Sequence, residues 1–146
     1  MKNLDMNKIL LFSCLGLLGL TQIAHAETIF SCKTGNNKRI EVQKVNKNLY
    51  EYKFGRASKN ELTIRNKKSE LLGRSEKWQG IGRAHWANMK FQNGEYIYSV
   101  WVNFDDSMQY NTDSGVDIER RGKLIAQIKC TPETVQKNFN DDEFSW

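Results

Sequence analysis

The sequence predicts an all-β domain: a small antiparallel meander, folded as a barrel or a sandwich of about eight strands, with a short C-terminal helix. Three observations predict this fold class. Short runs alternate apolar and polar residues, which is the period of strands with one buried face. Gly, Asn, Lys and Asp separate the runs, and Asn93-Gly94 is a strong hairpin signal because a type I′ turn needs positive φ at both central positions. No segment before residue 131 shows a convincing helical period.

Residues 1–26 are predicted to be a cleavable secretory signal peptide. Lys2 and Lys8 precede the apolar run Ile9–Leu20, and Ala24-His25-Ala26 offers the small residues that signal peptidase accepts. The apolar run is too short to cross a bilayer as a helix. We therefore expect a periplasmic or secreted protein with no permanent membrane span.

The mature chain is predicted to be one β domain over 27–130, followed by a C-terminal helix and acidic tail over 131–146. Cleavage leaves 120 of the 146 residues, enough for one core but not for two. Thr131 is a candidate N-cap with Pro132 at the first helical position. The mature chain keeps 20 of the 22 basic and 16 of the 17 acidic residues, a net charge of +4. This mild basicity is typical of a soluble domain and is also compatible with attraction to an anionic polymer.

Two of the three cysteines remain after cleavage. Cys14 lies in the signal peptide, where lipoprotein processing is an alternative to simple cleavage. Cys32 and Cys130 lie near the two ends of the β domain, and an even pair in an oxidising compartment predicts one disulfide. Two free thiols or a metal site are the alternative, which the lack of a CxxC motif and the single mature histidine, His85, disfavour.

The predicted strands each alternate in polarity and end at turn residues. In chain order they are Thr28–Lys33, Arg39–Val45, Leu49–Phe54, Glu61–Arg65, Trp78–Asn93, Glu95–Phe104, Gly115–Arg120 and Lys123–Cys130. Residues 66–77 are polar around two leucines and are predicted to be a loop, as is Asp105–Ser114. In the strand Glu95–Phe104 the alternation places Trp101 on the face opposite Val100 and Val102.

A set of short motifs carries a resemblance that covers most of the mature domain. They are Phe30-x-Cys32, Tyr52-x-Phe54-Gly55, Glu61-Leu62, Trp78-Gln79-Gly80-Ile81-Gly82-Arg83, Phe91-x-Asn93-Gly94-x-Tyr96-x-Tyr98-x-Val100, Gly115-Val116 and Ala126-x-x-x-Cys130. This skeleton resembles a group of small exported bacterial β-proteins of unknown function, so the resemblance implies no activity.

The general plan of the chain also resembles that of periplasmic lysozyme inhibitors, which combine a signal peptide, a small β-barrel and terminal cysteines. The chain departs from them because it has no segment matching the Ser-Gly-x-(Arg/Lys)-Tyr loop that enters the lysozyme cleft. The resemblance therefore concerns architecture and not the inhibitory loop.

The loop Phe104–Ser114 is the predicted partner-binding element, because aromatic and flexible apolar residues on a polar loop suit protein contact. Its candidate contact residues are Asp105, Asp106, Met108 and Tyr110. A solvated hairpin connection is the alternative. The acidic residues of the loop fit no EF-hand spacing, so no metal is expected.

A second candidate site combines aromatic and basic residues that could stack on and attract a ligand. Its members are Arg83, His85, Trp86 and Trp101. Core packing is the competing interpretation of the aromatics, and a surface position is the competing interpretation of the histidine.

The sequence contains no catalytic, metal or nucleotide motif, so we expect no enzyme activity and no cofactor. The predicted function is binding of a protein partner in the cell envelope, as an inhibitor or immunity protein against a hydrolase or toxin, and no nucleic acid is expected. The alternative is a module that binds anionic glycan or lipid through its aromatic and basic face.

Overall fold

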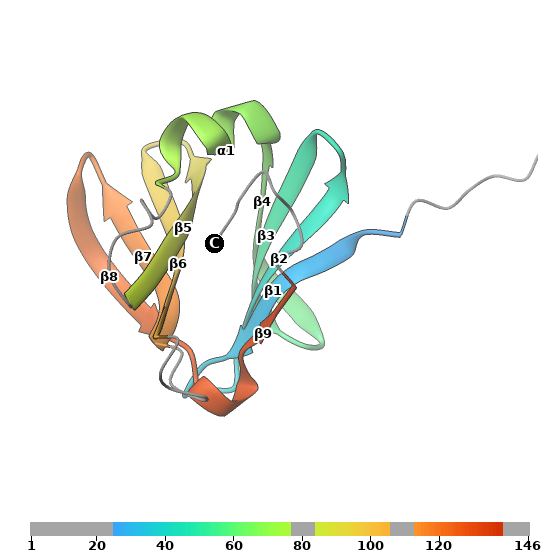
Figure 1. Cartoon of the computed structure of the whole chain (residues 1–146), viewed down its shortest axis with the longest axis vertical. Coiled ribbons are helices and arrows are strands. Elements are labelled where there is room, and N and C mark those ends of the chain that lie inside the picture. The colour runs from blue at the N-terminus through green and yellow to red at the C-terminus, as the bar shows by residue number, and fades with distance from the viewer. Residues whose placement is uncertain (1–24, 77–83, 106–112, 139–146) are drawn as a thin grey trace, which may run out of the picture.

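Two antiparallel sheets face each other in the computed structural model, which describes residues 25–76, 84–105 and 113–138 (Figure 1). The first sheet has the order β4-β3-β2-β1-β9 and is built from β1 (Glu27–Lys33), β2 (Arg39–Asn46), β3 (Leu49–Arg56), β4 (Lys59–Lys67) and β9 (Gln136–Lys137). The second has the order β5-β6-β7-β8 and is built from β5 (Ala84–Asn93), β6 (Tyr96–Asp105), β7 (Asp113–Arg120) and β8 (Lys123–Lys129). The all-β prediction is confirmed, and the arrangement is a sandwich and not a closed barrel.

The core lies between the two sheets because alternate side chains of the central strands point inward. Val42 and Tyr52 of the first sheet and Met89 and Val100 of the second are almost completely buried. The two layers meet at Tyr52, whose ring centroid lies 5.7 Å from that of Phe91 and 5.7 Å from that of Tyr98. Burial raises the pKa of the Tyr52 phenol well above its usual value, with the nearby Tyr98 adding to the effect.

The segment after β4 forms a helix, α1 (Lys68–Arg74), where the sequence predicted a loop. Leu71 is fully buried in the core, and the Glu70 carboxylate accepts a hydrogen bond of 2.7 Å from the Lys67 backbone N–H. The Arg74 Nε donates to the Lys90 carbonyl at 3.2 Å, so the helix also contacts β5. These tertiary contacts stabilise a helix too short to form alone, and Figure 1 shows it bridging the two sheets at one end.

A disulfide joins the two sheets, as predicted. Cys32 in β1 and Cys130, one residue beyond β8, form an S–S bond with a Cα–Cα separation of 5.7 Å. Both cysteines are buried, and the backbone N–H of Cys130 donates to the carbonyl of Ser114 at 2.9 Å. The bond therefore adds a covalent link between layers that are otherwise joined by side-chain packing and by a few hydrogen bonds, such as that from the Gln92 backbone N–H to Asn66 Oδ1 at 2.7 Å.

Within residues 131–138, the short helix predicted after the disulfide is a 3-10 turn. A single 3-10 turn spans Pro132–Thr134, with Pro132 at its start, as expected for proline. The chain then pairs with β1 as β9, in a register that matches Gln136 with Ser31. The Thr134 hydroxyl accepts a bond of 2.9 Å from the Lys33 backbone N–H, so the turn is held against the edge of β1. Residues 1–24 and 139–146, which include most of the predicted signal peptide and the acidic tail, lie outside the described residues.

Replacing both Cys32 and Cys130 with Ala is expected to lower the free energy of unfolding by about 4 kcal/mol. The bond closes a sequence separation of 98 residues, and a loop of this length restricts the unfolded chain strongly. Urea unfolding of the oxidised wild type, the reduced wild type and the double variant measures this. Coincident unfolding midpoints for the oxidised and reduced wild type would show that the bond contributes nothing.

Candidate functional site

The outer face of the four-stranded sheet brings two tryptophans together. Ala87 and Met89 of β5 are buried. Because successive side chains of a strand point to opposite faces, Trp86 points outward, with 38% of its surface exposed. Trp101 of β6 alternates in the same way with the buried Val100 and Val102. Trp86 pairs with Asn103 and Trp101 pairs with Asn88. The two tryptophans are therefore diagonal neighbours on one face, at a typical backbone separation of about 7–8 Å.

Trp101 is held in one orientation across the sheet. Its indole N–H donates to Asp117 Oδ1 at 2.9 Å, and the Lys129 Nζ lies 5.9 Å from the ring centroid. Gly115 of β7 stands directly opposite Trp101. A Cβ at Gly115 would lie 2.3 Å from the Ile128 carbonyl oxygen, so only glycine fits there, and the missing side chain leaves the outer face open beside the indole. The result is a fixed aromatic surface of the kind that stacks on flat or apolar ligand faces.

Polar groups surround the two indoles. The Gln127 amide donates to Asp117 Oδ1 at 2.8 Å, the same oxygen that accepts from Trp101. Among the described residues, no donor occupies Asp117 Oδ2, so that oxygen can accept a bond from a ligand hydroxyl. We call this surface the tryptophan face, defined as Trp86, Asn88, Trp101, Asn103, Asp117, Gln127 and Lys129.

The structure brings together part of the predicted site. Trp86 and Trp101 share the outer face of the four-stranded sheet, so neither of these two aromatic residues is part of the core between the sheets. For His85 and Asp105 the structure places only the backbone. His85 lies in β5 opposite Phe104, and Asp105 is the last residue of β6. The candidate residues Arg83, Asp106, Met108 and Tyr110 lie outside the described residues.

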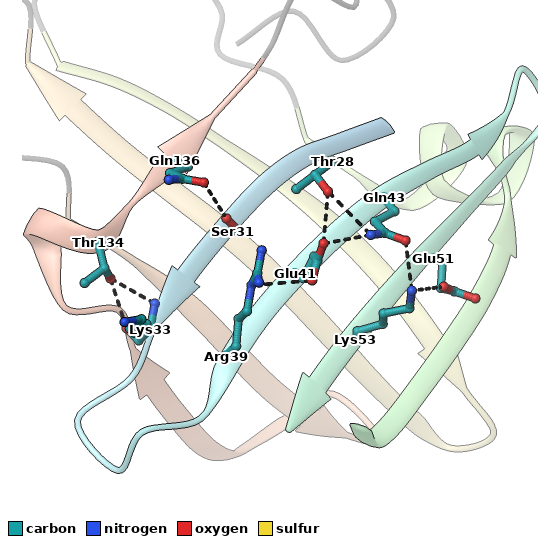
Figure 2. Close-up of polar contacts among 10 residues, drawn as sticks. All are labelled: Thr28, Ser31, Lys33, Arg39, Glu41, Gln43, Glu51, Lys53, Thr134 and Gln136. Carbon is teal, nitrogen blue, oxygen red and sulfur yellow. Dashed lines mark hydrogen bonds and ion pairs between the residues drawn. The ribbon is translucent and has the colours of Figure 1, made fainter. Parts of the chain in front are cut away.

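The outer face of the five-stranded sheet carries a connected set of polar side chains (Figure 2). Glu41 Oε1 accepts hydrogen bonds from the Thr28 hydroxyl at 2.9 Å and from the Gln43 amide at 2.7 Å. The Lys53 Nζ continues the chain of contacts, donating to Gln43 Oε1 at 2.8 Å and pairing with Glu51 at 2.8 Å. These groups link three adjacent strands on a face that the sequence marked as polar.

Glu51 is the most shielded carboxylate of this face, with 4% of its side chain exposed. Burial raises its pKa, but hydrogen bonds and charge from Lys53 and Arg65 lower it by more, so the pKa of Glu51 lies below its ordinary value. Arg65 also bonds Glu51 through its Nε. Ionised Glu51 is therefore an integral part of the folded state at neutral pH.

The residues that orient Trp101 cannot be identified from alternation alone. Alternation reveals which residues face outward, but a cross-strand partner depends on register. The Arg121-Gly122 turn, with positive φ at both residues, begins the hairpin of β7 and β8, and a register continued from it without interruption would pair Asp117 with Ala126. A register shift further along the hairpin moves the pairing by one residue and places Asp117 opposite Gln127.

One edge strand exposes apolar side chains. β8 ends the four-stranded sheet, and two adjacent residues near its start, Leu124 and Ile125, are 53% and 52% exposed. A register shift between Ile118 and Glu119 distorts the pairing at this point. Lys123 and Lys129 stand at the two ends of the strand, and such charges oppose uncontrolled strand pairing.

Comparisons with protein-family models, with curated proteins and with solved structures find no match for this chain. Within the residues that the structure describes, no three His, Cys, Asp or Glu side chains gather as a metal site. In the same part of the chain, no helix has the length and apolar character needed to cross a membrane.

Glu51→Gln is expected to destabilise the fold at neutral pH by about 1–3 kcal/mol, because Lys53 and Arg65 lose a charged acceptor. The pKa of Glu51 is lower in the folded protein than its ordinary value of 4.5 in the unfolded chain. Its contribution to the free energy of unfolding is therefore fully present above pH 4.5 and is lost as the pH falls from there through the folded pKa. Urea unfolding at a series of pH values measures both effects.

The matched control is Glu61→Gln on β4, whose carboxylate is 41% exposed and pairs with Lys38. It should change stability by less than about 1 kcal/mol. If the free energy of unfolding changed with pH in the same way for the wild type and E51Q across the acidic range, Glu51 would not be the source of the predicted pH dependence.

Proposed function

We propose that this protein is an exported, non-enzymatic binding protein whose tryptophan face holds a neutral glycan. The observation that carries the proposal is the fixed indole of Trp101, bonded to Asp117 and lying diagonal to the exposed Trp86. A sugar ring has an apolar face that stacks on an indole and hydroxyls that bond to amides and carboxylates. The tryptophan face offers both kinds of group on rigid strands.

The charges of this surface favour a neutral ligand over the anionic one suggested by the sequence. On the tryptophan face and at the outward positions beside it, Lys90 and Lys129 contribute two positive charges, and Asp113, Asp117 and Glu119 contribute three negative ones. Glu76, which pairs with Lys90 at 2.8 Å, adds a fourth negative charge. An anionic polymer would gain little from a surface on which negative charges outnumber positive ones.

Export is part of the same proposal. It is supported by the predicted signal peptide, by the two mature cysteines and by the disulfide that they form in the structure. Disulfides persist in oxidising compartments, where envelope glycans are also found.

Binding of a chito-oligosaccharide, a neutral chain of N-acetylglucosamine, is the direct test. Trp86→Ala and Trp101→Ala should each weaken binding about tenfold, a loss of about 1.4 kcal/mol of stacking free energy. Isothermal titration calorimetry measures the affinity, with Leu72→Ala on α1 as control because Leu72 is equally exposed, at 38%. The proposal would be contradicted if all three variants lost the same amount of affinity for the chito-oligosaccharide. It would also be contradicted if the wild type bound only an anionic polymer and added salt abolished that binding.

A second candidate, binding of an envelope hydrolase as an inhibitor, is favoured by the exposed Leu124 and Ile125 on the edge strand β8. An exposed strand edge is a template for pairing with a segment of another protein. The candidate loop residues Asp105, Asp106, Met108 and Tyr110 remain a separate prediction for the same function.

Inhibition of peptidoglycan hydrolysis by a purified lysozyme tests this candidate. Leu124→Glu and Ile125→Glu should abolish inhibition if β8 is the contact, whereas alanine at the four loop positions should abolish it if the loop is the contact. A wild type that leaves the hydrolysis rate unchanged at high excess removes lysozyme inhibition as the function.

A further inference from the structure

We infer that a hollow on the outer face of the five-stranded sheet, beside Lys33 and Arg39, is a binding site for a phosphate or sulfate group. The hollow has a volume of about 300 Å³ and is lined by Ser31, Cys32, Lys33, Arg39, Thr134 and Gln136. Figure 2 shows these strands side by side, with β9 and the 3-10 turn on one side of β1 and Arg39 of β2 on the other. The inference is independent of the glycan proposed for the opposite sheet.

Two cations face each other across the floor of this hollow. Lys33 of β1 and Arg39 of β2 are directly paired in the antiparallel register. Like charges at such a position repel and destabilise a sheet unless a counter-charge lies between them. Among the described residues, no carboxylate lies within ion-pair distance of Lys33. An oxyanion in the hollow would supply the missing negative charge.

The carboxylate closest to Arg39 is largely committed to other groups. Glu41 Oε1 accepts from Thr28 and Gln43, and only Oε2 approaches Arg39, at 3.4 Å from its Nε. A guanidinium has five N–H donors in a planar fork suited to oxyanions. Arg39 is 47% exposed, so the rest of that fork is open to a ligand.

Neutral donors complete the site. The Ser31 hydroxyl donates to Gln136 Oε1 over a long 3.4 Å, which leaves the Gln136 amide N–H groups available. Thr134 holds the backbone of Lys33 and donates to the Thr131 carbonyl at 2.7 Å, so it fixes the wall of the hollow. A tetrahedral oxyanion bound in the hollow would accept bonds from Lys33, Arg39 and Gln136, all of which line it. Whether the phosphate or sulfate is free or belongs to a larger molecule does not alter this chemistry.

Titration with inorganic phosphate and with sulfate, at constant ionic strength and with chloride as reference, tests the site. Calorimetry should show binding by the wild type, and thermal unfolding should shift upward with either anion but not with chloride. Arg39→Gln and Lys33→Gln should each weaken binding about tenfold. Glu41→Gln should strengthen it about threefold, because a nearby negative charge is removed.

Two controls separate this site from general charge effects and from misfolding. Arg121→Gln, at the β7–β8 turn of the other sheet, changes the net charge equally and should bind phosphate as the wild type does. Without phosphate, R39Q should unfold at about the same temperature as the wild type, because the lost repulsion from Lys33 offsets the lost pairing with Glu41. The inference is overturned if the wild type binds neither anion, if R39Q binds like the wild type, or if R121Q loses as much affinity as R39Q.

If the site is confirmed, the ligand source is decided by comparing inorganic phosphate with vesicles containing phosphatidic acid. Retention on vesicles that R39Q abolishes assigns a lipid headgroup, and binding of the free anion alone assigns a small solute. Trp101→Ala should leave both results unchanged. Failure of the phosphate site and failure of the glycan proposal can therefore be distinguished.

Discussion

The mutual burial of the two inner faces is the constraint on which the rest of the structure depends, and Tyr52 lies at its centre. Its ring contacts Phe91 and Tyr98 of the opposite sheet, and aromatic pairs of this kind add about 0.5–1.5 kcal/mol each beyond the area that they bury. Burial raises the pKa of the Tyr52 phenol further above neutrality, so this side chain contributes no charge to the core. Because the inner face of each sheet is buried, the alternation of side chains along a strand places the remaining side chains on the outer face.

The two outer faces that result differ in chemistry. On the four-stranded sheet, indoles and amides surround a carboxylate that orients Trp101, and negative charges outnumber positive ones. On the five-stranded sheet, charged groups form a continuous network from Thr28 to Glu51, and Arg39 lies at its margin with few partners. Each face is built on paired strands, so its side chains are held by the backbone more firmly than loop residues would be.

Much of the fold could be predicted from sequence because strand period and turn chemistry are local. The placement of Trp101 on the face opposite Val100 and Val102, the Asn93-Gly94 hairpin and the Cys32–Cys130 bond all follow from the order of residues alone. The helix α1 could not be predicted in this way, since its stability comes from one buried leucine and from contacts with β5. The pairing of β9 with β1 involves just two residues and depends on where the disulfide places the chain.

The candidate sites were less predictable for the same reason. Trp86 and Trp101 were identified as aromatic residues, but their shared face depends on the register of β5 with β6. The opposition of Lys33 and Arg39 depends on the register of β1 with β2, and neither residue is unusual in the sequence.

The position of the disulfide has a consequence for biosynthesis. Cys32 lies in the first strand and Cys130 lies beyond the eighth, so a ribosome makes the two thiols almost a full domain apart. No incomplete chain that ends before Cys130 can close the bond, and these two cysteines can pair within one chain in a single way. The bond therefore forms only after all the residues of β1 to β8 have been synthesised, and it ties the first of these strands to the end of the last.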